Sequence, residues 1–241
     1  MRSAVTPLAG VRDGHCVYLG PPPRGDVHST SVAQLVVGVD APVIVEAEGL
    51  PDIVTRSTVA PARVPHRIRA LGERVLICYF DPATAAPRLG EMVCRHGPFG
   101  IGHPRERSLI EAGAVHALDI DAVLSLARLP VGDIDPRITK VASMIRADPA
   151  RRHRAVASAA ELGLSRSHFL RLFAEQTATS YRRYIQWARI LHAADAIADG
   201  ADFTRAASEA GFASPSHFSD VFRDMFGITP RALFTSGVRF G

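Results

Sequence analysis

Residues 211–233 read GFASPSHFSDVFRDMFGITPRAL, and this stretch decides the fold of the C-terminal part of the chain. Ser214 is a helix-capping residue, and Phe218, Val221 and Phe222 follow it at i, i+3 and i+4 spacing. That spacing buries one stripe of a helix and leaves the opposite face exposed. A short alanine-rich segment and a turn glycine precede the cap, so the pattern predicts two helices joined by a tight turn.

The same pattern occurs twice. Residues 165–173 read SRSHFLRLF and residues 214–222 read SPSHFSDVF, with an offset of 49 and five of nine positions identical. The first copy carries its apolar triplet at Phe169, Leu172 and Phe173. A helix, a glycine-containing turn and a second capped helix form a helix-turn-helix unit, whose second helix enters the DNA major groove. On spacing alone, the alternative is an all-helical interaction module with a duplicated hairpin that binds protein.

Helical patterns fill the rest of residues 131–241. Asp135 can cap the first helix, with Pro136 at its first position and an apolar stripe behind it. Further helices are expected over residues 155–161, 181–199, 203–210 and 214–225, with a last short turn from Thr229.

The N-terminal part has a different pattern, with short strand-like segments separated by turns. Strands are expected at residues 32–37, 43–46, 53–59 and 75–80, and helices at residues 105–112 and 121–129. Such strands, without helices between them, predict an antiparallel barrel or sandwich. The expected class is therefore α+β. Residues 1–130 would form one domain and residues 131–241 a helical one, with a linker at 130–135; residues 83–104 stay unassigned.

Composition narrows the class of protein. The chain has 241 residues and is 47% hydrophobic, which excludes whole-chain disorder. The longest stretch without a charged residue is 27–39, shorter than the ~20 residues of a spanning helix, so no membrane partner is expected. Three cysteines without clip spacing, and no secretory signal, predict a reducing, cytoplasmic setting.

The basic charge is concentrated in the second half. Residues 1–130 hold 13 Arg and 13 Asp plus Glu, whereas residues 131–241 hold 15 Lys plus Arg against 11 Asp plus Glu. The whole net charge of +4 therefore lies in the predicted helical domain. Only Lys140 is a lysine among the 28 basic residues, and arginine suits phosphates and guanine edges.

Residues 135–236 resemble the AraC/XylS-type DNA-binding domain. The residues that carry the resemblance are Ala159, Leu164-Ser165, His168-Phe169, Phe173, Arg189, Ala207, Gly211-Phe212, Ser216-His217-Phe218, Phe222 and the tail Phe226-Gly227-Ile228-Thr229-Pro230. The resemblance implies two helix-turn-helix units joined by one long helix, which bind adjacent major-groove segments. It also implies a transcription regulator with double-stranded promoter DNA as its partner. RNA polymerase, a small-molecule effector and a second copy of the chain are further candidate partners, and no cofactor is expected.

Residues 10–82 resemble the small cupin-type β-barrel that often precedes this module. The residues that carry this resemblance are His28, Gln34 and Val64-Pro65-His66. His28, Gln34 and His66 are therefore the candidate effector-binding residues, with a structural role as the alternative for both histidines. A cupin-type metalloenzyme is the rival function, but it needs three or four converging ligands and the pattern offers no such set.

The resemblance and the exposed helix faces together give the candidate DNA contacts. In the first unit, Arg171 is expected to donate to a guanine, Leu170 to contact a thymine methyl and Arg166 to contact a phosphate, with Ser167 at a base-facing position. In the second unit the candidates are Pro215, Ser216, His217, Ser219, Asp220 and Arg223. Arg182, Arg183 and Arg231 are expected to contact the DNA backbone.

Two positions depart from the family's pattern, and a third, Arg189, has an expected structural role. Asp220 stands where relatives often carry a basic or amide residue, so it either accepts a hydrogen bond from cytosine or weakens contact of the second helix with DNA. Ala178 stands at the helix end where the second copy has Gly227, a position that favours a positive φ. Arg189 in the long helix is expected to form an internal ion pair.

Overall fold

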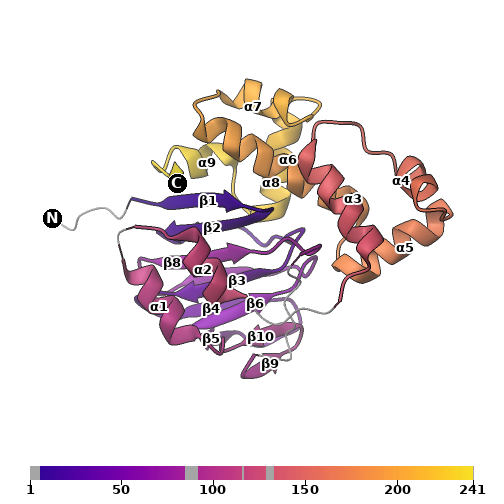
Figure 1. Ribbon diagram of the computed structural model, residues 1–241. Coiled ribbons are helices and arrows are strands. Elements are labelled where there is room, and N and C mark those ends of the chain that lie inside the picture. The colour runs from indigo at the N-terminus through magenta and orange to yellow at the C-terminus, as the bar shows by residue number, and fades with distance from the viewer. Residues whose placement is uncertain (1–5, 85–91, 116, 129–132, 241) are drawn as a thin grey trace.

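The structure is a computed structural model that describes residues 6–84, 92–115, 117–128 and 133–240. A β-rich N-terminal part lies beside a helical C-terminal part (Figure 1), which confirms the expected α+β class. The described strands form an eight-stranded sheet, in the order β11-β1-β2-β8-β3-β6-β10-β9, and a three-stranded sheet, β5-β4-β7. Their bounds are β1 Leu8–Arg12, β2 His15–Gly20, β3 Gln34–Gly38, β4 Val43–Glu46, β5 Ile53–Thr55, β6 Ser57–Ala60, β7 Arg67–Ala70, β8 Val75–Tyr79, β9 Cys94–His96, β10 Phe99–Ile101 and β11 Arg239–Phe240. Two helices, α1 (Glu106–Ala114) and α2 (Ile120–Ala127), belong to this part.

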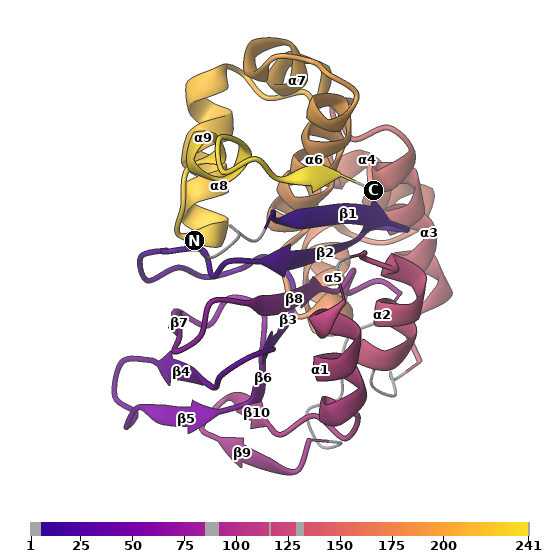
Figure 2. The ribbon, with the colours of Figure 1, turned by 90° about the vertical axis from the view of Figure 1, so that its left-hand side faces the viewer.

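Strand β8 lies inside the large sheet and is buried on both faces. It pairs antiparallel with β2 on one side and with β3 on the other. Leu76 and Cys78 pack in a cluster with α1 and α2, whereas Ile77 and Tyr79 pack in a cluster with C-terminal helices. Apolar neighbours on both faces explain why this strand shows no polar alternation. Figure 2 shows α1 and α2 beside the sheet.

The strand predictions needed several corrections. The expected strand 53–59 is two strands, β5 and β6, in different sheets, because the chain bends at Arg56. Asp13 and Gly14, with φ of 52° and 82°, form a tight turn between β1 and β2, a hairpin that was not predicted. Strands β7, β9 and β10 were also not predicted. Residues 130–132 of the expected linker lie outside the described residues.

The C-terminal helices follow the prediction closely. Helices α4 and α5 form the first helix-turn-helix unit, α7 and α8 form the second, and α6 joins them. The expected caps are present, because the side chains of Asp135, Ser165 and Ser214 accept hydrogen bonds from first-turn N–H groups. The helix bounds are α3 Pro136–Ala147, α4 Ala155–Glu161, α5 Arg166–Thr177, α6 Tyr181–Ala198, α7 Phe203–Glu209, α8 Pro215–Phe226 and α9 Pro230–Phe234.

Helices α5 and α8 end in the same backbone conformation. Ala178 has φ 54° at the end of α5, and Gly227 has φ 71° at the end of α8. The first unit therefore keeps the left-handed turn without the glycine that favours it, at a cost of about 1 kcal/mol.

The two units are buried in different cores. The first unit shares a cluster with α3 and α6 that includes Phe169, Phe173 and Tyr184. The second unit, through Phe218 and Phe222, belongs to the same cluster as the large sheet. Strand β11 also pairs with β1 in parallel, so the chain end returns to the N-terminal sheet.

Candidate nucleic-acid interface and effector pocket

Helix α5 presents the predicted base-contacting side chains of the first unit. Arg166, Ser167 and Arg171 are exposed, whereas Leu170 is half-buried. The Arg171 guanidinium lies 3.8 Å from the Glu175 carboxylate, and both side chains are mostly exposed. Such an exposed pair is weak, so Arg171 can exchange this partner for a DNA base at little cost.

An open groove of about 490 Å³ gathers predicted DNA contacts from three helices. Arg166 and Leu170 come from α5, Arg182 from the start of α6 and His217 from the start of α8. The other residues lining the groove are Arg152, His153, Ala155, Ser180, Tyr181, Ile185, Gln186 and Arg189. Arg152 and His153 were not among the predicted contacts, although the basic run of residues 151–154 before α4 was a usable signal.

Helix α8 carries a weaker basic surface than α5. Pro215 and Ser216 are exposed at its start, and Ser219 is half-buried. Asp220 is exposed, and its carboxylate lies 3.8 Å from the Arg223 guanidinium. The negative charge of Asp220 therefore partly neutralises the positive charge of Arg223, the predicted phosphate contact, on one exposed face of α8.

The three arginines expected at the DNA backbone occupy different environments. Arg182 lines the groove, and Arg231 is exposed on α9. Arg183 does not fit the expected role, because its guanidinium donates to the carbonyl of Ser29 and to the hydroxyl of Ser31, the latter at 3.2 Å. Arg183 also lies 3.6 Å from Asp224. This arginine links α6 to the N-terminal part of the chain.

Arg189 also differs from the expectation. Its guanidinium donates to the carbonyl oxygens of Pro149, at 2.9 Å, and Arg151, at 3.5 Å. The expected internal ion pair is therefore replaced by backbone carbonyls near the end of α3. Burial lowers the pKa of Arg189 from its ordinary value.

The three candidate effector residues lie together. His28 and His66 form an isolated antiparallel bridge, with ring centroids 4.9 Å apart. The Gln34 amide donates to His66 Nε2 at 2.5 Å, and His66 Nδ1 donates to the carbonyl of Val64 at 2.7 Å. Both contacts fit a neutral imidazole. Burial lowers the pKa of His66 to about 4, and it also lowers the pKa of His28.

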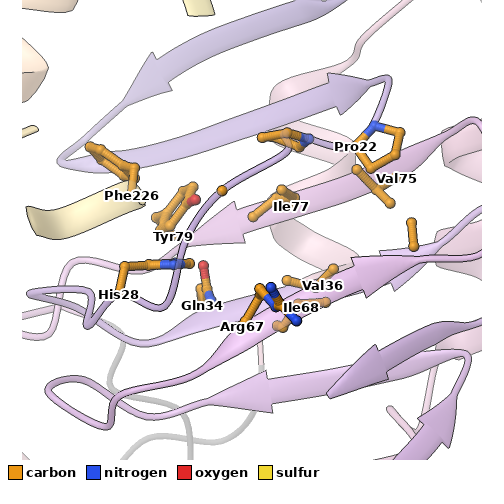
Figure 3. A pocket seen from close by; sticks show the side chains of 13 residues that line it. Pro22, His28, Gln34, Val36, Arg67, Ile68, Val75, Ile77, Tyr79 and Phe226 are labelled. Carbon is orange, nitrogen blue, oxygen red and sulfur yellow. The ribbon is translucent and has the colours of Figure 1, made fainter. Parts of the chain in front are cut away.

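A pocket of about 50 Å³ opens beside these residues (Figure 3). His28, Gln34, Arg67 and the hydroxyl of Tyr79 supply its polar groups. The remaining lining residues are Pro22, Pro23, Gly25, Val36, Ile68, Ala70, Val75, Ile77 and Phe226. His66 does not line it and supports Gln34 instead. Phe226 comes from the end of α8, a tertiary contact that no local pattern in the sequence could predict.

A set of converging metal ligands is the feature that the rival metalloenzyme function would need. Within the part of the chain that the structure describes, no group of three or more His, Cys, Asp or Glu side chains could hold a metal ion. No helix among the same residues has the length and apolar character needed to cross a membrane.

Comparison with known proteins gives one matching family profile and several similar solved structures. The profile of a family described as a helix-turn-helix domain matches residues 158–236. ToxT from Vibrio cholerae O395 is 13% identical, with a TM-score of 0.61 over 93% of this chain and 98% of its own. Wild-type ToxT from Vibrio cholerae bound to an unsaturated fatty acid is 14% identical, with a TM-score of 0.60 over 98% of each chain.

A DNA-binding transcriptional dual regulator from Escherichia coli K-12 matches a smaller share of this chain. It is 30% identical, with a TM-score of 0.36, over 40% of this chain and 93% of its own. No curated protein matches the sequence. The ToxT structures show that this chain shares their fold along most of its length.

Proposed function

We propose that this chain, in which a helix-turn-helix domain matches residues 158–236, is a DNA-binding transcription regulator of the AraC type that contacts promoter DNA through α5 and α8 and responds to a small molecule in its N-terminal domain. The observation that carries the proposal is the groove in which Arg166, Leu170, Arg182 and His217 meet. These residues come from both helix-turn-helix units and from the helix between them.

The first unit is proposed to determine most of the DNA sequence preference. Arg171 would donate to O6 and N7 of a guanine, and Leu170 would contact a thymine methyl. Arg166 and Arg182 would contact phosphates and set the register on the duplex. Ser167 lies beside them on the exposed face of α5. Arg152, at the rim of the same groove, joins this set.

The second unit is proposed to make looser contacts. Pro215, Ser216, His217 and Ser219 form the start of the face that would meet DNA. Arg223 and Arg231 would contact phosphates, but Asp220 would weaken that approach, because a desolvated carboxylate near phosphates needs a well-aligned partner.

The pocket beside His28 and Gln34 is the proposed effector site. One side carries polar groups, including Arg67, and the rest is apolar, which suits a molecule with an apolar body and one polar or anionic end. The fatty-acid-bound ToxT structure, which shares the fold, supports this class of ligand. We assign the effector domain to residues 1–130 and the DNA-binding domain to residues 131–241. A second copy of the chain and RNA polymerase are further proposed partners, and the proposal involves no catalytic step.

Selection of bound DNA from a random pool by the full chain tests the DNA part of the proposal. A recovered consensus with two adjacent segments is expected, and its affinity should fall as salt rises because phosphate contacts release counterions. Arg171→Ala should lose preference at one base pair. A folded chain that enriches no sequence would overturn the proposed function.

A thermal-shift titration tests the effector part. Hexanoate is the probe, and hexanol is the matched control that lacks the anionic end. Hexanoate should raise the melting temperature, and Arg67→Gln should abolish the difference between the two compounds. An equal rise in melting temperature with hexanol would contradict the proposal that the ligand has an anionic end. No rise with either compound would contradict the proposed class of ligand.

A further inference from the structure

The irregular segment of residues 22–31 touches both the effector pocket and the second helix-turn-helix unit. One side of the segment lines the pocket through Pro22, Pro23, Gly25 and His28. On the other side, the Asp26 N–H donates to the carbonyl of Gly227 at 3.0 Å, and the Ser29 N–H donates to the carbonyl of Asp224 at 3.5 Å. The segment is therefore bonded through its main chain to the end of α8.

The contact between the segment and α8 leaves no free space. A Cβ atom on Gly227 would lie 2.5 Å from the Asp26 carbonyl oxygen and 2.9 Å from His28 Nδ1. A Cβ atom on Gly25 would lie 3.2 Å from the carbonyl oxygen of Phe226. Because two backbones meet at this distance, a displacement of the segment toward α8 must also displace the end of that helix.

The last residue of α8 is itself a wall of the pocket. Phe226 lies beside Tyr79 in Figure 3, and the two ring centroids are 5.3 Å apart in an edge-to-face arrangement. Phe226 also contacts Phe222 of the same helix, at a centroid distance of 4.5 Å. A molecule in the pocket would therefore touch the second recognition helix directly.

The helices that share a core with the first unit, α3 and α6, are anchored at a different place. Asp81 follows β8, lies outside the residues that line the pocket, and accepts hydrogen bonds from Arg146 of α3 and Tyr184 of α6 at 2.5 and 3.0 Å. Strand β8 is paired along both edges, so it resists displacement. Arg183 links α6 to residues 29–31 only through its long side chain, which can follow a movement by changing rotamer.

We propose that the segment of residues 22–31 couples the pocket to the second helix-turn-helix unit alone, so that a ligand alters contact with only one of the two DNA segments. The inference rests on the proposed function, because that function identifies the pocket as an effector site. The mechanical coupling can be tested without ligand or DNA.

Hydrogen–deuterium exchange of the full chain tests the coupling. Ala70→Leu places apolar atoms inside the pocket from β7, and Val54→Leu, on the exposed face of the same small sheet, is the matched control. Ala70→Leu should speed exchange in residues 222–229 by about threefold or more and leave residues 169–178 unchanged. Equal acceleration in both regions, or none in either, would overturn the proposal. Ala70→Val replaces Ala70→Leu if circular dichroism shows that the larger side chain prevents folding.

A second arm uses the selected DNA. For DNA sites that differ from the selected site in the second segment, Gly227→Ala should change the affinity of the chain about tenfold. For DNA sites that differ in the first segment, the affinity should change by less than about twofold. Gly200→Ala is the control for backbone strain, because Gly200 has φ +93° but has no neighbour within 4 Å of its Cβ position. The same change in both variants, or at both segments, would overturn the coupling. If no DNA sequence is selected, the proposed function fails, whereas the exchange result still decides the coupling.

Discussion

The two helix-turn-helix units arise from nearly the same sequence pattern, but they are attached to the sheet by different forces. The first unit shares an apolar core with α3 and α6, and these two helices are linked to the sheet through the buried carboxylate of Asp81. The second unit shares one continuous core with the sheet, through Phe218 and Phe222. A duplicated local motif therefore does not imply duplicated tertiary surroundings.

The difference matters because polar and apolar contacts respond differently to displacement. The Asp81 network needs a fixed geometry, and a shift of an ångström breaks its hydrogen bonds. Aromatic packing, such as that of Phe226 against Tyr79 and Phe222, tolerates small rearrangements at lower cost. We therefore expect the first unit to be held rigidly and the second to be the adjustable one.

The largest effect is expected from Asp81→Ala. The carboxylate is fully buried, and the side chain of Arg146 is 23% exposed, so removal of one partner leaves a poorly solvated charge. Burial raises the pKa of Asp81 despite the nearby arginine, but the paired charge still needs its partner. The free energy of unfolding should fall by about 3 kcal/mol in urea titrations. Arg107→Ala, which removes an exposed ion pair, is the control. A smaller loss of unfolding free energy for Asp81→Ala than for this control would refute the role of Asp81 as an anchor.

Acidification should weaken the structure around two buried histidines, His15 beside Asp81 and His66 beside Gln34 of the effector pocket. The pKa of His15, which accepts a hydrogen bond from the Asp81 N–H, and the pKa of His66 are each lowered to about 4, mainly by burial. A folded pKa below the ordinary 6.5 means that this stability is complete above pH 6.5 and is lost as the pH falls toward 4. Each histidine should contribute about 3 kcal/mol to that loss.

Unfolding curves at several pH values for wild type, His15→Gln and His66→Gln check this prediction. Each variant should show a shallower loss than wild type between pH 7 and pH 4. Comparison between variants removes the titration of Asp81, whose raised pKa acts in the opposite direction. Identical slopes in all three proteins would show that the histidines do not titrate as described.

DNA-binding measurements should distinguish the roles of Arg171 and Arg166 in the first unit. Arg171→Ala is expected to cost about 1–3 kcal/mol at the preferred site and to relax one base position. Arg166→Ala should weaken all sequences by a similar factor, because a phosphate contact carries no base preference. Gel shifts on a panel of single-base variants measure both. Loss of preference at the same position in both variants would contradict the division of roles.

Asp220→Asn should strengthen binding modestly on all sequences, by about threefold, because it removes a negative charge near phosphates. The same panel of sites measures this change. Weaker binding of the variant, confined to sites with one particular cytosine, would show instead that Asp220 accepts a hydrogen bond from that base.

The smallest effect on stability is expected at the ends of the recognition helices. Ala178→Gly should stabilise the chain by about 0.5–1 kcal/mol, because Ala178 occupies a left-handed conformation at φ 54°. Thermal unfolding measures the change. A destabilised variant would mean that the methyl group of Ala178 contributes more through packing than it costs in backbone strain.

The helical half of the fold could be predicted because its signals are local. The capping serines, the apolar triplets and Pro136 each act within one or two turns, and the structure confirms the helices they predict. The strands were harder, since a short apolar segment does not specify its partner strand. Thus the predicted strand 53–59 became two strands in different sheets.

The sequence by itself determined two capped recognition helices, the helix between them and the candidate residues on their exposed faces, because periodicity and capping are encoded by neighbours along the chain. Only the tertiary structure decided that Arg183 is bonded to Ser29 and Ser31, and that Phe226 closes a pocket beside His28. These contacts join residues far apart in sequence, and no local pattern encodes which distant surface a side chain meets. Packing of the second unit against the sheet fixes them, because burial of the shared apolar core outweighs what each isolated segment prefers.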